Sequence, residues 1–396
     1  MKVGVHLNFQ NYHDWDRFER KASDEPQPVT DAQIYEEDLH LGSLVEPLGY
    51  DSLWAIDHHF SPYIMTGGAV QNLTYFAGMT ERIDFGTMVV VLPWYDPIAI
   101  CEQISVLDNM LQGRKLTIGL GRGAGQREFD GFRVPMGESR ERFLESLEIL
   151  RKAWSSEFFA HEGEFFTIAE TTIRPRPRTP DLLDHLKVAW ISPGTLRIAA
   201  DAGLGMLFTN QKKWEEYRVD MRDFNAVRAE HGWGPKQPTV VVNVVCTKDR
   251  DEGWERMVRH VTEAQESVER HYHFSDSAHF KQAGGYEFYE QFEKTLKKKS
   301  VEEIGEFNAR PQVFGSPEEC LDKIHYIQRM TSAEELVLNF RFGGMPIGQA
   351  EESLRRFSET VLGDVQAIEP QLHEYSEDDE EAVAAGGKQS YRLPGA

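Results

Sequence analysis

An acid and two histidines stand where a buried strand is expected to end. The segment DSLWAIDHHF at positions 51–60 runs from apolar residues into Asp57, His58 and His59. An imidazole titrates near neutral pH, so one of these histidines could serve as an acid or a base. Successive strand residues point to opposite faces, so the three share one site only if the strand has already ended. The triplet therefore predicts either a proton-transfer group or a polar strand cap.

A second strand end carries an arginine between two glycines. The segment GRKLTIGLGRG at positions 113–123 places Gly121 and Arg122 directly after an apolar run. Glycine lets the backbone approach a ligand closely, and the guanidinium fork suits phosphate. In a parallel barrel the C-terminal strand ends share one mouth, so Arg122 and a histidine from 57–59 would face the same bowl. This combination predicts an enzyme that acts with a phosphate-bearing cofactor.

A further anion signal lies at WISPGT, positions 190–195. An expected strand leads into Ser192, Pro193, Gly194 and Thr195, and an expected helix follows them. Backbone N–H groups at a helix N-terminus, together with two hydroxyls, form a good phosphate cradle. Ser192 could also be an ordinary N-cap. Because Arg122 lies one strand earlier, we favour phosphate binding.

Four aromatic residues fall near expected C-terminal strand ends. An aromatic layer at that level can line a pocket for a flat or apolar ligand, or it can belong to the core. Sequence alone leaves both interpretations open for Phe9, Trp94, Tyr95 and Trp190.

A metal site is not predicted. Zinc needs three or four ligands in converging geometry. His58, His59, His271 and His273 could supply them, but their spacing does not require it. A metal-dependent barrel hydrolase is therefore a distant alternative.

The glycine-rich segment 119–124 also fits the pattern G-x-G-x-x-A. A dinucleotide fingerprint should follow the first strand of a βαβ unit and open directly into a helix. Here it follows the fourth expected strand, and Pro135 precedes the next expected helix, Glu138–Trp154. We therefore reject a dinucleotide-binding motif.

Short apolar runs alternate with longer amphipathic ones through most of the chain, which is typical of parallel βα units. A (β/α)8 TIM barrel accounts for 396 residues better than an open sheet does. The expected strands are Lys2–Phe9, Ser52–Asp57, Asp84–Leu92, Leu116–Gly121, Leu186–Ile191, Gly205–Phe208, Val240–Cys246 and Glu335–Phe340.

We expect one barrel domain over residues 1–365, with insertions at about 158–180 and 267–310. The first insertion alternates like a hairpin. The second is long and polar, so it is either an active-site lid or a surface excursion. Residues 366–396 contain an acidic run and are expected to form a flexible, solvated tail.

Composition narrows the function classes. Hydrophobic residues make up 40% of the chain, which is ample for a core. The formal charge of −22 argues against nucleic-acid binding, which needs clustered lysine and arginine. No apolar stretch is long enough to span a membrane, and no signal peptide is evident. Three widely separated cysteines suggest free thiols in a reducing compartment. We expect a cytoplasmic protein.

These motifs, in this order, resemble the bacterial luciferase-like family of flavin-dependent monooxygenases. The resemblance covers about residues 1–360. It is carried by DSLWAIDHHF, IDFGTMVVVLPWYDPIAICEQISVLDNMLQGR, LTIGLGRG, ISPGT, VFGSPEEC and LVLNFRFGG. It implies a TIM barrel that binds reduced FMN, with O2 as co-substrate. Flavin C4a would form a peroxyflavin, which would oxidise a small organic molecule.

The resemblance also implies residue roles. His58 matches the family's active-site histidine. Asp57 sits where luciferases have a glutamate, and it is expected either to contact the cofactor or to fix the tautomer of the histidine. The bond between Met88 and Val89 falls where the family often has a non-proline cis peptide under the flavin ring. Ile191 replaces a glutamate that contacts the flavin in luciferase.

Phosphate binding matches as well, at Arg122, Ser192 and Thr195. A separate NAD(P)H:flavin reductase and a homodimer follow from the same resemblance. Two alternatives remain: a hydride-transfer enzyme that uses the deazaflavin F420, and a non-catalytic flavin-binding partner subunit.

Overall fold

Eight parallel strands close into a barrel in the computed structural model, which describes residues 1–190, 193–209, 213–274 and 301–373. Each strand pairs with its neighbours in the order β9-β11-β1-β2-β3-β4-β7-β8, and β8 pairs back to β9. The barrel strands are β1 (Lys2–Leu7), β2 (Ser52–Ala55), β3 (Asp84–Val91), β4 (Leu116–Gly121), β7 (Leu186–Trp190), β8 (Gly205–Thr209), β9 (Thr239–Cys246) and β11 (Glu335–Asn339).

The expected fold is confirmed, and the eight barrel strands are the eight expected from the sequence. Their apolar runs are buried on both faces, as in β4, where all six residues are buried. Parallel strands that are covered on both faces consist of nearly continuous apolar residues, and for this reason the strands could be located from the sequence. The ends of the strands differ from expectation by only one or two residues.

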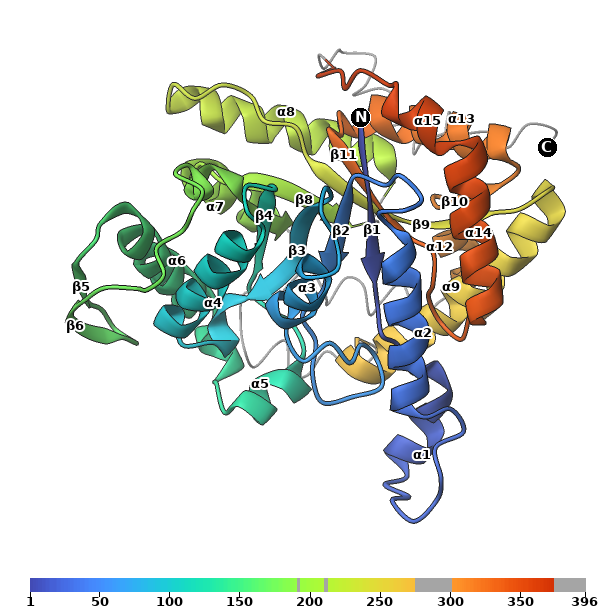
Figure 1. Ribbon diagram of the computed structural model, residues 1–396, viewed down its shortest axis with the longest axis horizontal. Helices are drawn as coiled ribbons and strands as arrows, with labels where there is room; N and C mark the ends of the chain where they lie inside the picture. The colour runs from blue at the N-terminus through green and yellow to red at the C-terminus, as the bar shows by residue number, and fades with distance from the viewer. Residues whose placement is uncertain (191–192, 210–212, 275–300, 374–396) are drawn as a thin grey trace.

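Helices surround the barrel (Figure 1). Pro97 opens α4, and the Asp96 side chain caps this helix by accepting from Ile98 N and Ala99 N. The longer helices are α2 (Asp31–Leu44), α3 (Ala69–Ala77), α4 (Pro97–Met110), α6 (Ser139–Ser155), α7 (Pro193–Asp201), α8 (Trp214–Glu230), α9 (Arg250–Tyr272), α12 (Val301–Ala309), α13 (Pro317–Thr331) and α14 (Ile347–Thr360). Within the described ranges, no helix is both long and apolar enough to cross a bilayer.

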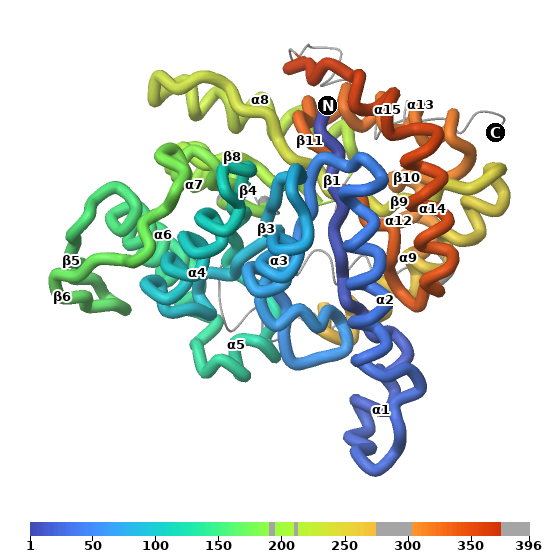
Figure 2. Tube along the Cα trace, in the orientation of Figure 1, coloured from blue at the N-terminus to red at the C-terminus, as the bar shows by residue number. Residues whose placement is uncertain are grey.

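Several shorter helices and strands lie outside the barrel. The hairpin expected within 158–180 is present, as antiparallel β5 (Phe159–Glu162) and β6 (Thr167–Thr171) at the edge of the molecule (Figure 2). The strand β10 (Val313–Gly315) adds to β9 outside the closed barrel. Two short helices are α1 (Trp15–Glu19) and α15 (Leu362–Gln366).

The second expected insertion is only partly described. Its start belongs to α9 and its end to α12, whereas residues 275–300 lie outside the described part of the chain. The expected lid therefore falls there. Most of the expected acidic tail, residues 374–396, also lies outside it.

The short helix that follows β4 was not expected from the sequence. The short helix α5 (Gln126–Phe132) begins well before Pro135, so the expectation that no helix starts until after this proline was wrong. Seven residues make barely two turns, too few for an apolar repeat to stand out. Gly125 precedes the helix, and Arg133 ends it in a left-handed conformation. As described below, α5 carries the central acid of the candidate site.

The barrel interior is filled by a small apolar cluster around a tryptophan. Trp54 packs there with Met88, Leu207, Val241 and Val337, apart from the larger core between barrel and helices. Room for its indole comes from facing glycines. A Cβ on Gly86 would lie 2.3 Å from the ring.

We therefore predict that Gly86→Ala destabilises the protein by about 1–3 kcal/mol, because the buried indole has no room to move away. Gly348→Ala is the matched control. Its Cβ would meet nothing within 4 Å, and it lies in α14, where alanine is the better helix former. Urea unfolding of both variants checks the pair. Equal midpoints would contradict the packing argument.

Candidate active site

The C-terminal ends of the barrel strands bring the candidate residues to one rim. His58 follows β2, Arg122 follows β4, and α7 begins directly after β7. The strands β4 and β7 are hydrogen-bonded neighbours, with Leu120 opposite Val188. In Figure 1, α5 and α1 lie beyond the arrowhead end of β1. The rim therefore gathers a histidine, an arginine and a helix N-terminus, as the sequence predicts for a shared mouth.

His58 is held between two polar partners. Its Nδ1 lies 2.9 Å from Glu128 Oε1, and its Nε2 lies 3.2 Å from Tyr272 Oη. The Tyr63 ring packs edge-on against the imidazole. An ionised carboxylate can only accept, so Nδ1 carries the proton in this contact. The remaining nitrogen, Nε2, is then the atom available for proton exchange.

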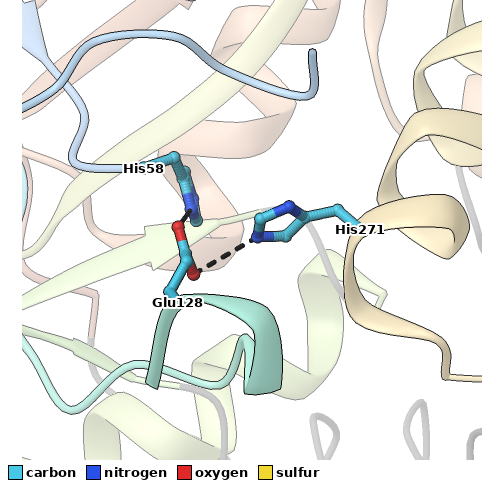
Figure 3. Close-up of side chains that lie close together, drawn as sticks. All are labelled: His58, Glu128 and His271. Atoms are coloured by element: carbon cyan, nitrogen blue, oxygen red, sulfur yellow. Dashed lines mark hydrogen bonds and ion pairs between the residues drawn. The ribbon is translucent and has the colours of Figure 1, made fainter. Parts of the chain in front are cut away.

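Glu128 joins three segments that are distant in sequence (Figure 3). Its side chain is fully buried on α5. One oxygen meets His58 Nδ1 and the backbone N–H of His59 at 2.9 Å, and the other lies 3.2 Å from His271 Nε2 near the end of α9. Ser61 Oγ lies 2.8 Å from His271 Nδ1. This carboxylate thus ties the loop after β2 to both helices.

The imidazoles keep this buried carboxylate charged. Burial alone would raise the pKa of Glu128, but the charges and hydrogen bonds of His58 and His271 outweigh it and lower the pKa to about 2. Burial also lowers the pKa of His271, against the opposing effect of Glu128. At neutral pH the pair is therefore an ionised glutamate beside a neutral His271.

Asp57 serves a second, separate network. Its buried carboxylate accepts from Val91 N at 3.1 Å and from Tyr95 Oη at 3.0 Å, and it lies 2.9 Å from His59 Nε2. These contacts link the end of β2 to the end of β3. Asp57 was expected to contact the cofactor, but in the structure its carboxylate is occupied by protein partners. It acts as a positioning residue.

The expected phosphate-binding residues are partly described. Arg122 is half-buried after β4, and Thr195 is half-buried in the first turn of α7. Gly194 lies in the same turn. Ser192 and Ile191 fall outside the described residues, as does the side chain of Trp190. Gly121 makes room within the barrel wall, because a Cβ there would lie 2.3 Å from Val89 Cγ2.

The aromatic residues expected near the strand ends lie in different surroundings. Trp94 belongs to an apolar cluster with Phe129 and Phe274, and Val89 and Tyr272 pack against it. The Trp94 Nε1 atom has no hydrogen-bond partner among the described residues. Tyr95 is occupied by Asp57, as above.

Phe9 does not line this cluster. It is fully buried in the main core, with its ring 4.6 Å from that of Tyr35, so its expected place in a pocket is not supported. The Met88–Val89 bond is a cis peptide, as expected. Both residues lie where the β3–β4 pairing shifts register.

A groove of about 350 Å³ leads to His58 from outside the barrel. It lies between the 58–67 loop and the segment that contains α1. The exposed ring of Phe60 and the side chains of Phe18 and Met65 give it an apolar part. Its polar lining includes Asp14, Arg17, Gln27 and Asp31.

Glu128 was not expected as a site residue from the sequence, and neither His271 nor Tyr272 was expected to lie beside His58. One signal for Glu128 was available, because it lies in the connection after β4, where barrel enzymes place site residues. No comparable signal marked His271. It lies more than two hundred residues from His58, and only the packing of α9 brings the two imidazoles to a ring separation of 5.4 Å.

The sequence is similar to those of known proteins. The family model described as luciferase-like monooxygenase matches residues 19–334. The alkanal monooxygenase alpha chain of Photorhabdus luminescens is 22% identical over 346 residues, covering 85% of this chain and 94% of its own. An uncharacterised Sinorhizobium fredii protein, y4vJ, is 34% identical over 145 residues. That match spans 37% of this chain and only 41% of the relative.

Solved structures share the same fold. Monooxygenase RslO1 from Streptomyces bottropensis superposes with a TM-score of 0.72 at 22% identity, covering 92% of this chain and 99% of that one. The oxygenating constituent of 3,6-diketocamphane monooxygenase from Pseudomonas putida, in complex with FMN, gives 0.66 at 18%, covering 92% and 98%. An F420-dependent secondary alcohol dehydrogenase gives 0.64 at 14%, covering 91% and 98%.

The Asp57 network yields a stability prediction. We expect Asp57→Asn to lower the free energy of unfolding by about 1.5–3 kcal/mol, because an amide cannot accept from all of these donors. Tyr95→Phe removes one partner, and the double variant should lose less than the sum of the two single losses. Urea unfolding of the cycle measures this. Strict additivity would show that Tyr95 and Asp57 do not interact.

Proposed function

Because this chain belongs to the luciferase-like monooxygenase family, we propose that it uses reduced FMN and O2 to oxidise a small organic molecule. The observation that carries the proposal is the rim itself. His58, Arg122 and the N-terminus of α7 all follow strands that end around one barrel mouth. A related structure, from Pseudomonas putida, contains FMN.

The residues present fit an FMN phosphate. The nine-residue helix α7 starts at the end of β7, beside the strand that delivers Arg122. A helix N-terminus and a guanidinium together favour a dianionic group. Thr195, half-buried in the first turn, adds a hydroxyl.

The floor of the mouth suits a flat ring. Val89 packs against both the barrel-interior cluster and the apolar cluster that contains Trp94, so it lies between them. The unpartnered Trp94 Nε1 leaves a buried donor in this region. We propose that Met88, Val89 and the aromatic cluster support the isoalloxazine, and that Trp94 and Tyr95 lie near the organic substrate.

His58 is the proposed acid–base residue. Reduced flavin, when bound, supplies the electrons that activate O2. Glu128 accepts a hydrogen bond from His58 Nδ1–H and thereby fixes the orientation of the ring. Nε2 can then hold or release a proton beside Tyr272 Oη. Burial of the Glu128–His271 pair also excludes water from that side of the imidazole. We further propose a separate NAD(P)H:flavin reductase and a homodimer.

A second candidate is F420-dependent hydride transfer on the same barrel. An F420-dependent glucose-6-phosphate dehydrogenase from Kineococcus radiotolerans is 31% identical over 180 residues, covering 43% of this chain and 52% of its own. Anaerobic titration with reduced FMN and, in parallel, with reduced F420 separates the two. Tighter binding of FMN followed by O2 consumption supports the first candidate. Tighter binding of F420 without O2 consumption supports the second.

We predict that Arg122→Ala weakens binding of reduced FMN about 10-fold to 100-fold, because a charge-assisted phosphate contact is worth about 1.5–3 kcal/mol. Arg133→Ala is the control, since this exposed arginine lies at the end of α5. Anaerobic fluorescence titration measures both dissociation constants. An unchanged constant for Arg122→Ala would remove Arg122 from the phosphate site.

His58→Gln should leave the dissociation constant of reduced FMN within about 2-fold, since the side chain contacts no expected phosphate group. With any substrate found by screening, it should divert oxidation toward hydrogen peroxide, because proton control at Nε2 is lost. The measurement is peroxide and product per flavin oxidised. His161→Gln, in the β5–β6 hairpin, is the control. Unchanged coupling in His58→Gln would contradict the role.

A further inference from the structure

The side chains of His58, Glu128 and His271 form a compact cluster of potential metal ligands. Each residue offers one ligand atom, these three atoms all lie within 4.8 Å of one another, and all three residues are buried. They come from the loop after β2, from α5 and from α9, so they converge in space rather than along one element (Figure 3). We propose that these three residues form a binding site for a divalent transition-metal ion.

Two facing atoms support a cation at this point. Glu128 Oε2 and His271 Nε2 are both buried and lie 3.2 Å apart, and among the described residues each is the polar contact of the other (Figure 3). In the tautomer whose Nδ1 donates to Ser61 Oγ, Nε2 presents a lone pair to the carboxylate. Two acceptors then face each other, and a shared cation satisfies both.

The spacing suits a metal. Two ligands at about 2.0–2.1 Å from a tetrahedral ion lie roughly 3.3 Å apart. The contact between His271 Nε2 and Glu128 Oε2 is 3.2 Å. The contact between His58 Nδ1 and Glu128 Oε1, at 2.9 Å, needs to open only slightly. Two imidazoles and one carboxylate are the donor set of catalytic zinc sites and of non-haem iron sites.

The surrounding contacts hold each ligand in place. Ser61 Oγ engages the other nitrogen of His271, the backbone N–H of His59 donates to Glu128, and Tyr272 Oη engages His58 Nε2. Metal ligands in proteins are commonly oriented by such outer contacts. Gly125 gives the carboxylate its position, because a Cβ there would lie 2.2 Å from Glu128 Oε2 and 3.1 Å from His271 Nε2.

Binding would change the tautomer of His58. A metal bound at Nδ1 would take the lone pair of that nitrogen, so the single proton of the neutral ring would move from Nδ1 to Nε2 through solvent, with no net release. His58 Nε2 would change from acceptor to donor toward Tyr272 Oη. Metal binding and a base role for Nε2 therefore exclude each other, so the ion would act as a reversible inhibitor of the proposed chemistry. The site itself does not depend on the proposed function.

Titration with Co2+ tests the site without a flavin or a substrate. After treatment with a chelator and dialysis, we expect Co2+ to give the visible absorption of a four- or five-coordinate ion, saturating at one ion per chain. Zn2+ should abolish the signal by competition. Absence of this absorption in the wild-type protein would overturn the proposal, whatever the behaviour of the variants.

Variants identify the ligands. Glu128→Gln and His271→Gln should each weaken Co2+ binding at least about 10-fold. His260→Gln is the matched control, because His260 is also buried and lies 2.7 Å from a glutamate, Glu263, elsewhere on α9. Thermal unfolding checks that each variant is folded. Equal Co2+ affinity in wild type, Glu128→Gln and His271→Gln would show adventitious surface binding and overturn the proposal.

Discussion

Closure of the parallel barrel is the constraint on which the rest of this structure depends. Hydrogen bonding from β8 to β9 completes the ring, so every strand points the same way and every C-terminal end reaches one rim. Residues as distant in sequence as His58 and Arg122 therefore lie around one opening. The small interior cluster around Trp54 fills the barrel, so the reactive groups are confined to its mouth.

Two buried carboxylates then give the adjacent histidines separate tasks. Asp57 engages His59 and joins the end of β2 to β3, whereas Glu128 engages His58 and joins the same loop to α5 and α9. The Asp57 network is structural, because protein groups already occupy the carboxylate of Asp57. In the second network, Glu128 bridges His58 and His271, the two imidazoles to which we assign the proposed proton-transfer and metal-binding roles.

FMN and F420 are the two cofactors under consideration for this barrel. The anion site that we propose at Arg122 and the start of α7 would suit any phosphate-bearing cofactor. The family match and the FMN-containing relative favour flavin, while the F420-dependent relatives share the barrel. On this proposal, the choice between FMN and F420 would depend on the residues around the cofactor ring, near Met88 and Val89, and not on the phosphate site.

The sequence by itself determined the barrel, because each buried parallel strand reads as a local apolar run and needs no distant information. It also placed His58 and Arg122 at strand ends, since the residue after such a run is fixed by chain order. Tertiary structure alone decided the partners. Glu128 sits on a helix too short to show a repeat, and His271 reaches His58 only through the packing of α9. Phe9 entered the core for the same reason, because burial at a strand end depends on what packs above it, here Tyr35.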